Sequence, residues 1–413
     1  MRLDKSYDVE LAETRNDDAN ERWRVLALMT SAQAGSSLVQ QALGSLSPLL
    51  VAVFALSKAQ LGVVFSAILF GATLFTAISG ALTDRWGERT MLLASAIVMT
   101  AALLGATLFA NYHWLVGMMM VYGAGYAAST PAGGRAILAW FDRDRGFAMG
   151  IRQTGVSVGA FIGAVGLPLV ASAGGFRAAF TFAAVFVALP SGLAFALYRE
   201  SRDDGTRSSL SSVAQGMKVL LRDPRLIAVT LTCMLLSAGQ FIMNAFLTIT
   251  ATTVARTSIS VAGFALAAAF LGAICGRVGW GFVSDRYFGG DRLVPLAMIS
   301  VLAAVAAALL ALLSAGSVVT LFCASALLGL TAAGWNGLMA AALSEVGGTE
   351  RAASALGLGL TGIFAASAVA PWLFGFAADR TSLSWAWGAV AVMSLVATAP
   401  VMWLRLTTHH RSG

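Results

Sequence analysis

Long apolar stretches alternate with short polar segments along the whole 413-residue chain. Twelve stretches are longer than the roughly 20 residues that a helix needs to cross a bilayer. They are Val25–Leu56, Ala59–Thr83, Thr90–Ala110, Trp114–Phe141, Gly146–Ala173, Ala178–Tyr198, Leu226–Ala251, Ile259–Val283, Leu293–Ser314, Val318–Leu343, Ala352–Ala378 and Trp385–Leu406. The pattern predicts an all-α integral membrane protein with 12 transmembrane helices in two six-helix, pseudo-symmetric bundles.

A polar segment divides the predicted spans into two sets of six. Arg199–Arg225, rich in arginine, aspartate and serine, separates the sixth span from the seventh. We therefore expect an N-terminal bundle at 25–198, a linker, and a C-terminal bundle at 226–406. The polar ends, 1–24 and 407–413, are predicted to be cytosolic tails, and the mixed charge of the first one argues against a signal peptide.

Short repeats relate the two predicted bundles. Gly80–Arg85 ends the second span, and Gly281–Arg286, with the same spacing of glycine, aspartate and arginine, ends the eighth. Arg145 and Arg351 likewise open the fifth and the eleventh spans. Such repeated motifs are expected when two parallel six-helix repeats are related by an axis normal to the membrane. In proteins of this kind the substrate site lies at the interface of the two repeats.

Composition and charge exclude several other classes of protein. Charged residues make up only 11% of the chain, against about 25% in soluble proteins. If both termini are cytoplasmic, most basic residues of the loops and tails lie on the cytoplasmic side. Because cytoplasmic loops of membrane proteins are enriched in lysine and arginine, this distribution predicts cytoplasmic termini in a cell (inner) membrane. They form no basic stripe with stacking aromatics, so nucleic acid is not an expected partner. No metal-ligand spacing, phosphate loop or nucleophile–base set is present, so we expect no cofactor, no metal and no enzyme.

One arginine lies deep inside a predicted span. Arg277 precedes Asp285 by eight residues, so in a helix it lies about 12 Å deeper than the carboxylate at the span's end. A cation near mid-depth costs at least ~2.5–3.5 kcal/mol and normally faces a cavity or a partner. Arg277 is therefore the leading candidate for holding an anion.

Arg152 is a second cation inside a span. It follows Arg145 by seven residues, which places it about 10 Å into the fifth span. With Gln153 and Thr154 it forms a polar patch in an apolar helix. Two interpretations stay open, a second contact to the anion and a gating or interdomain role. Arg135, beside two glycines, is predicted to have a structural role.

The acidic residues all lie in loops, in the tails or at the ends of spans. A dedicated proton carrier would normally be a buried carboxylate or histidine. We therefore expect coupling through the substrate itself, by a protonated acid, anion exchange or uniport, with protons or a counter-anion as partners.

The loop motifs resemble a known family. Gly80–Arg89 (GALTDRWGER) resembles the loop between spans two and three of the major facilitator superfamily, and Gly281–Arg286 its second-half counterpart. Trp140–Gly150 (WFDRDRGFAMG) is similar to a loop of monocarboxylate transporters and oxalate:formate antiporters. Arg277 matches the eighth-span arginine that those families use on a carboxylate, and nitrate/nitrite porters also carry one there. The resemblance covers nearly the whole chain and implies two bundles that expose a central cavity alternately to each side.

The chain departs from those families in its second cation. The oxalate and nitrate families add a basic residue in the eleventh or the second span, respectively. Here 352–378 contains none, and Thr76 stands at the equivalent position of the second span. The first-span lysine of animal monocarboxylate carriers is also missing. The resemblance therefore implies a small anion without naming it.

Together these features predict an alternating-access secondary transporter of a small organic anion, a mono- or dicarboxylate, that works as a monomer in the lipid bilayer. The alternatives are a drug or metabolite efflux antiporter, which would need an acidic cavity for cations, and an inorganic anion porter of the nitrate or cyanate type. The substrate-binding candidates are Arg277, Arg152, Gln153, Tyr126, Trp335, Asn336, Asn244 and Gln40. The gating and interdomain candidates are Asp84, Arg85, Asp285, Arg286, Arg145 and Arg351.

Overall fold

The computed structural model describes residues 5–141, 145–198 and 222–409. Within them every regular element is helical, which confirms the predicted fold class. The N-terminal half holds α1 (Lys5–Ala42), the 3-10 helix η1 (Leu43–Leu46), α2 (Ser47–Phe54), α3 (Lys58–Trp86), α4 (Glu88–Gly105), α5 (Tyr112–Trp140) and α6 (Arg145–Leu197). The C-terminal half holds α8 (Pro224–Thr253), α9 (Ile259–Tyr287), α10 (Leu293–Ala311), α11 (Val318–Ala332), α12 (Asn336–Arg380), α13 (Leu383–Val396) and α14 (Thr398–His409).

Ten helical stretches of the described residues are long and apolar enough to cross a membrane. One of them, Ala148–Leu197, is 50 residues long and contains two predicted spans. Its helix, α6, breaks at Gly175, where φ is 69° and ψ is −168°. Residues that carry a side chain rarely adopt such a positive φ, whereas glycine does, so Gly175 permits the turn. The two arms of α6 count as two spans, which makes eleven. The helix α5, 29 residues long and not among the ten, is the twelfth, in agreement with the predicted number.

Side-chain caps fix the starts of several helices. Ser57 accepts a hydrogen bond from the Gln60 backbone at the start of α3, and Asn111 accepts one from the Trp114 backbone at the start of α5. Ser258 caps α9 in the same way. Such caps satisfy backbone N–H groups that have no partner inside the helix. All three helices begin at the end of the molecule that is remote from the chain termini. We call this end the far end, and we call the opposite end the tail end.

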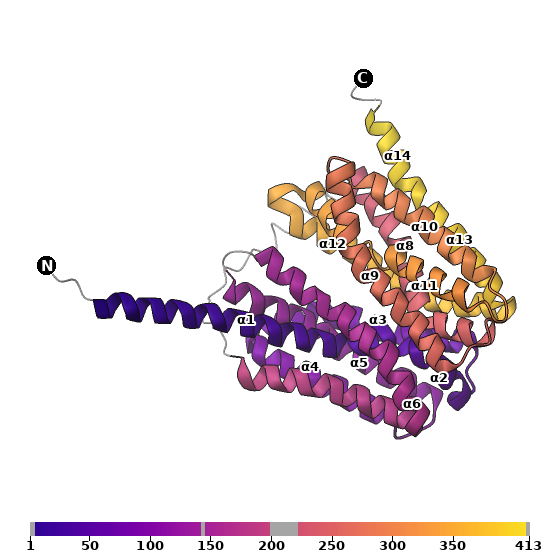
Figure 1. Cartoon of the computed structure of the whole chain (residues 1–413), viewed down its shortest axis with the longest axis horizontal. Helices are drawn as coiled ribbons and strands as arrows, with labels where there is room; N and C mark the ends of the chain where they lie inside the picture. Colours follow the sequence, from indigo (N-terminus) through magenta and orange to yellow (C-terminus); the bar gives the residue numbers. More distant parts are fainter. Residues whose placement is uncertain (1–4, 142–144, 199–221, 410–413) are drawn as a thin grey trace.

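The two halves meet at the far end and diverge toward the tail end, where the chain termini lie (Figure 1). Gly44 of η1 packs directly on the backbone of Asn244 in α8, and Gly62 of α3 packs on the backbone of Pro371 in α12. A methyl group at either glycine would overlap the opposing carbonyl, so these close approaches need glycine. We call this contact the far-end seal. It comprises Gly44, Ser47, Lys58 and Gly62 of one half, with Asn244, Thr248, Pro371 and Asp379 of the other.

Polar contacts reinforce the far-end seal. The Ser47 hydroxyl donates to the Ala245 carbonyl at 2.6 Å, and the Thr248 hydroxyl donates to the Gly44 carbonyl. The Asp379 carboxylate accepts from the backbone N–H groups of Lys58 at 2.9 Å and of Ala59 at 2.8 Å. Asp379 therefore caps the N-terminus of α3 from the other half, where a negative charge is favoured by the unpaired N–H groups and the helix dipole.

Candidate substrate-binding site

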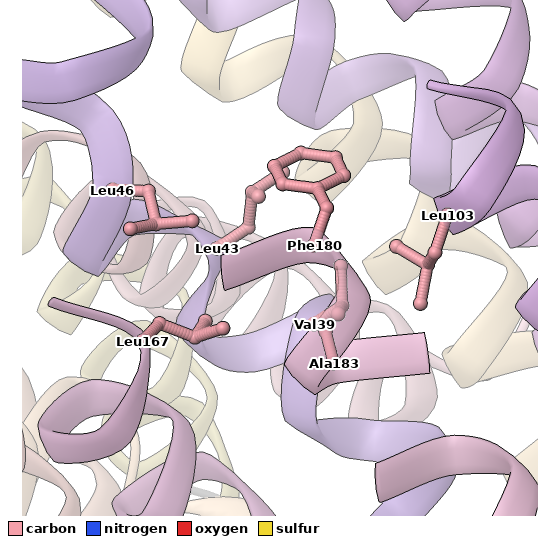
Figure 2. Close-up of a pocket in the computed structure, with 7 residues that line it drawn as sticks. All are labelled: Val39, Leu43, Leu46, Leu103, Leu167, Phe180 and Ala183. Carbon is pink, nitrogen blue, oxygen red and sulfur yellow. The ribbon is translucent and has the colours of Figure 1, made fainter. Parts of the chain in front are cut away.

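A small gap inside the N-terminal half is not a substrate site. Figure 2 shows seven apolar side chains around it, contributed by α1, η1, α4 and α6. The gap leaves no space that would admit a water molecule, and no polar group lines it. It is a packing defect of the bundle core, since a substrate site needs convergent polar groups as well as space.

Arg277 joins the two halves near the middle of α9. Its Nη1 donates to the Ser157 hydroxyl of α6, in the opposite half, at 3.0 Å. Its Nε faces the Ala333 carbonyl at 3.4 Å. The side chain is half-buried. Both contacts are to neutral groups, so the guanidinium charge has no carboxylate partner among the described residues.

A break in the tenth predicted span creates one of these acceptors. α11 ends at Ala332 and α12 begins at Asn336, so the three residues between them are not helical. The Ala333 carbonyl, freed from a helical bond, accepts from Asn336 Nδ2 at 3.2 Å as well as facing Arg277. Trp335 is only 2% exposed, and its indole N–H donates to the Ala332 carbonyl at 2.6 Å. Both predicted candidates thus shape the break beside Arg277.

Arg152 lies inside the N-terminal half and is 1% exposed. Its Nη2 donates to Gln33 Oε1 at 2.5 Å, and it lies 3.3 and 3.2 Å from the carbonyls of Ser129 and Thr130. Its buried Nε has no hydrogen-bond partner. No carboxylate in the described part of the chain pairs with it. A buried cation with neutral partners and an unused donor is costly, because water no longer solvates the charge.

The two arginines, which come from opposite halves, approach each other at α6. Ser157, the hydroxyl partner of Arg277, follows Arg152 by five residues on that helix, and Tyr126 of α5 lies near enough to both guanidinium groups to be affected by their charge. The structure therefore brings Arg152, Arg277 and Tyr126, three predicted site residues, into one region at the interface of the halves. Ser157 and Gln33 complete this arginine site. Sequence gave no specific signal for Ser157, one serine among many, whereas Gln33 shares a helix face with Gln40, seven residues away.

The remaining substrate-binding candidates are distributed over three places. Gln153, next to Arg152, is exposed. Gln40 is buried on α1. Asn244 is buried in the far-end seal, where its Nδ2 donates to Gln41 Oε1 at 2.7 Å across the two halves.

Two of the gating candidates lie at the tail end of α9. Asp285 pairs with Arg292 of its own half, which also pairs with Glu345 at 3.0 Å. Burial opposes the charge of Arg292, but its hydrogen bonds to Asp285 and Glu345 raise the pKa of Arg292 above its usual value. Arg286 and, in the other half, Arg85 are exposed. The structure does not describe the side chains of Asp84, Arg145 and Arg351. The interdomain role of the six gating candidates therefore stays a prediction.

Arg135 differs from the two site arginines. Its Nε lies 3.5 Å from a carboxylate oxygen of Glu88, which is buried at the start of α4 and also accepts from the Tyr198 hydroxyl at 2.7 Å. The ion pair joins α4 and α5 within one half, in keeping with the structural role predicted for Arg135.

Two six-helix halves, joined at one end and carrying unpaired charges at their interface, define a multi-pass membrane carrier. The Major Facilitator Superfamily model matches residues 29–254 and 234–413, and the chain belongs to that family. It is therefore a secondary transporter of the major facilitator type.

The relatives of this chain include transporters of different substrate classes. An uncharacterised MFS-type transporter of Mycobacterium tuberculosis is 29% identical over 93% of this chain and 85% of its own length. The 4-hydroxybenzoate transporter PcaK of Pseudomonas putida is 26% identical over 51% of this chain and 49% of its own. A multi-drug resistance efflux pump PmrA homolog of Lactococcus lactis is 24% identical over 58% and 59%.

Solved structures show the same fold. A bacterial homolog of the human lysosomal transporter Spinster, in an inward-facing and unoccupied conformation, superposes with a TM-score of 0.75 at 16% identity, over 92% of this chain and 96% of that one. The nucleoside transporter NupG superposes with a TM-score of 0.75 at 15% identity, over 92% and 98%. At these identities the likeness concerns the fold alone.

Proposed function

We propose that this chain transports a small organic anion whose carboxylate binds between Arg277 and Arg152. The observation that carries this proposal is the pair of arginines, one from each half, that meet at α6 and have no carboxylate partner among the described residues. A bound carboxylate would supply the missing negative charge. The planar guanidinium of Arg277 can hold it through two parallel hydrogen bonds.

The same geometry supports a coupling between binding and closure. Arg277 reaches across to Ser157, so an anion bound there would contact both halves at once. The halves are sealed at the far end and diverge toward the tail end (Figure 1). The distribution of basic loop residues supports a cytosolic tail end in a cell (inner) membrane. In that orientation the present conformation would receive or release the anion on the cytosolic side.

The charges favour an anion over a lipophilic cation. A cationic drug would be repelled by Arg277 and Arg152, and within the described spans no carboxylate pairs with either residue to offset that repulsion. Among the relatives, the 4-hydroxybenzoate transporter PcaK agrees with this proposal, because 4-hydroxybenzoate carries a carboxylate, whereas the multi-drug resistance efflux pump PmrA homolog does not support it. Coupling would then run through the substrate, by symport of its proton, by anion exchange or by uniport.

Thermal unfolding of the detergent-purified protein against a ligand panel tests the proposal. The panel contains benzoate, 4-hydroxybenzoate, lactate, succinate, nitrate, glucose 6-phosphate and tetraphenylphosphonium. A ligand at 100 times its Kd adds about 2.7 kcal/mol of stability, so we expect at least one carboxylate to raise the Tm of wild type. The shift should vanish in Arg277→Ala and persist in Arg177→Ala, which removes an exposed arginine. Stabilisation by tetraphenylphosphonium alone, or a carboxylate shift that survives in Arg277→Ala, would overturn it.

A further inference from the structure

Carboxamide side chains from both halves gather on the side of the far-end seal that faces the arginine site, and one of them, Asn244, belongs to the seal itself. On α1 they are Gln40 and Gln41, and on α8 they are Gln240 and Asn244, all less than 9% exposed. The Gln41–Asn244 hydrogen bond places the two helices side by side here. Gln240 precedes Asn244 by four residues, so both lie on one face of α8.

Three of these carboxamides have unused hydrogen-bonding groups. Gln40 Oε1 and Asn244 Oδ1 are buried without a partner. Gln240, 5% exposed, makes no side-chain hydrogen bond to any described residue. Gln33, on the same face of α1, is by contrast bonded to both Arg152 and Ser37. Buried amide groups are nearly always hydrogen-bonded, so two buried unsatisfied amide oxygens beside an unbonded glutamine need an explanation.

The cluster is continuous with the arginine site. Gln33, which holds Arg152, precedes Gln40 by seven residues of α1, about 10 Å along the axis. Between them, the Tyr122 hydroxyl donates to the Ser36 carbonyl at 2.6 Å. Tyr122 lies one helical turn from Tyr126, which interacts with both arginines. The arginines and the carboxamides are thus separated by about two turns of α1, a distance that a small carboxylic acid held by hydrogen bonds at both ends can span.

We infer that Gln40, Gln240 and Asn244 form a second subsite, which binds a hydroxyl group on the tail of the substrate. A hydroxyl donates one hydrogen bond and accepts others, and so complements carboxamides, which offer an acceptor oxygen and donor N–H groups. The substrate class that fits both ends is a hydroxy acid, with its carboxylate on the arginines and its hydroxyl on the carboxamides. This inference rests on the carboxylate site proposed above.

A comparison of matched acids tests the subsite. Binding of benzoate and 4-hydroxybenzoate, and of butyrate and 4-hydroxybutyrate, is measured by the ligand concentration dependence of the Tm of the full-length protein. Because one net hydrogen bond is worth about a factor of ten in Kd, wild type should prefer the hydroxylated acid of each pair about tenfold or more. Gln40→Met and Gln240→Met keep the side-chain volume but remove the amide, and should bring that preference near one while the deoxy acids bind as before.

Thr232→Val is the control, because Thr232 is a buried polar residue of α8 whose hydroxyl bonds within its own half, to the Ala397 carbonyl. It should keep the wild-type preference. Carboxylate binding with no hydroxyl preference, or a preference that both methionine variants retain, would refute the subsite and leave the proposed function standing. If no carboxylate binds to wild type, both proposals fail.

Discussion

Replacing Asp379 by asparagine should open the far end of the molecule. In the structure the Asp379 carboxylate accepts two backbone N–H groups at the start of α3, and Lys58 Nζ lies 3.5 Å away. Hydrogen bonds to a charged group contribute about 1.5–3 kcal/mol each when intact. An amide keeps the size of the side chain but loses the charge and one acceptor. Since about 1.4 kcal/mol is a factor of ten in an equilibrium, we expect a shift of roughly tenfold or more toward far-end-open conformations.

The reaction rate of a cysteine placed in the far-end seal measures this shift. Ser47, fully buried in the seal, is replaced by cysteine in a background in which Cys233, Cys275 and Cys323 are alanine. A membrane-impermeant maleimide should label it faster in the Asp379→Asn variant than in its parent.

Asp291→Asn is the matched control. Asp291 also caps a helix, accepting from the Leu293 N–H at 2.8 Å, and lies 3.5 Å from Arg405, but all three residues belong to one half. Its replacement should leave the labelling rate unchanged. Equal rates for Asp379→Asn and its parent would show that Asp379 does not hold the halves together.

Replacing Arg152 by methionine should stabilise the ligand-free protein and abolish its response to an anion. Arg152 is a buried charge with neutral partners and an unpaired Nε. Replacing a buried ion pair by apolar side chains of similar volume is often neutral or stabilising by about 1–4 kcal/mol, and the loss of Arg152 leaves no carboxylate of the described residues without its partner. The Ser129 and Thr130 carbonyls that Arg152 contacts belong to helix α5, so the change does not strip them of their helical bonds. The Tm without ligand should rise, while stabilisation by carboxylates should fall sharply.

Arg135→Met provides the contrast, because Arg135 is a cation of the same half that pairs with buried Glu88. Its loss leaves that carboxylate without its cation, so the Tm should fall and the anion response should remain. A decrease in Tm for Arg152→Met, together with full stabilisation by carboxylates, would assign Arg152 to structure.

The sequence predicted the spans and the deep arginine because both are local properties. Apolar length defines a span, and the eight residues between Arg277 and Asp285 define a depth. The division into two halves rests on one polar segment, of which residues 199–221 lie outside the described residues, so its role as a linker stays a prediction. The turn at Gly175 lies between the predicted spans that end at Ala173 and begin at Ala178, although no sequence feature singled out the glycine itself.

The contacts between the halves could not be predicted from spacing. Ser157 and Arg277 are 120 residues apart, and Asp379 is 321 residues from Lys58. Nothing near Asp379 in the sequence indicates that it caps a helix of the other half. The break at Ala333 is not predictable from the sequence for a related reason. The Ala333 carbonyl acts as an acceptor for Arg277 only because the two residues pack side by side in the folded protein.

Uptake of radiolabelled acids into proteoliposomes tests most directly whether Arg277 carries the substrate. Wild type, Arg277→Lys and Arg177→Ala are compared with 4-hydroxybenzoate, lactate and succinate. Lysine keeps the charge but cannot hold a carboxylate with two parallel N–H groups. We predict that wild type and Arg177→Ala take up at least one acid equally well. Arg277→Lys should give the same yield of folded protein but lose at least about nine-tenths of that uptake. The loss of one hydrogen bond to a charged group accounts for a factor of this size. Uptake by Arg277→Lys at the wild-type rate would contradict the account.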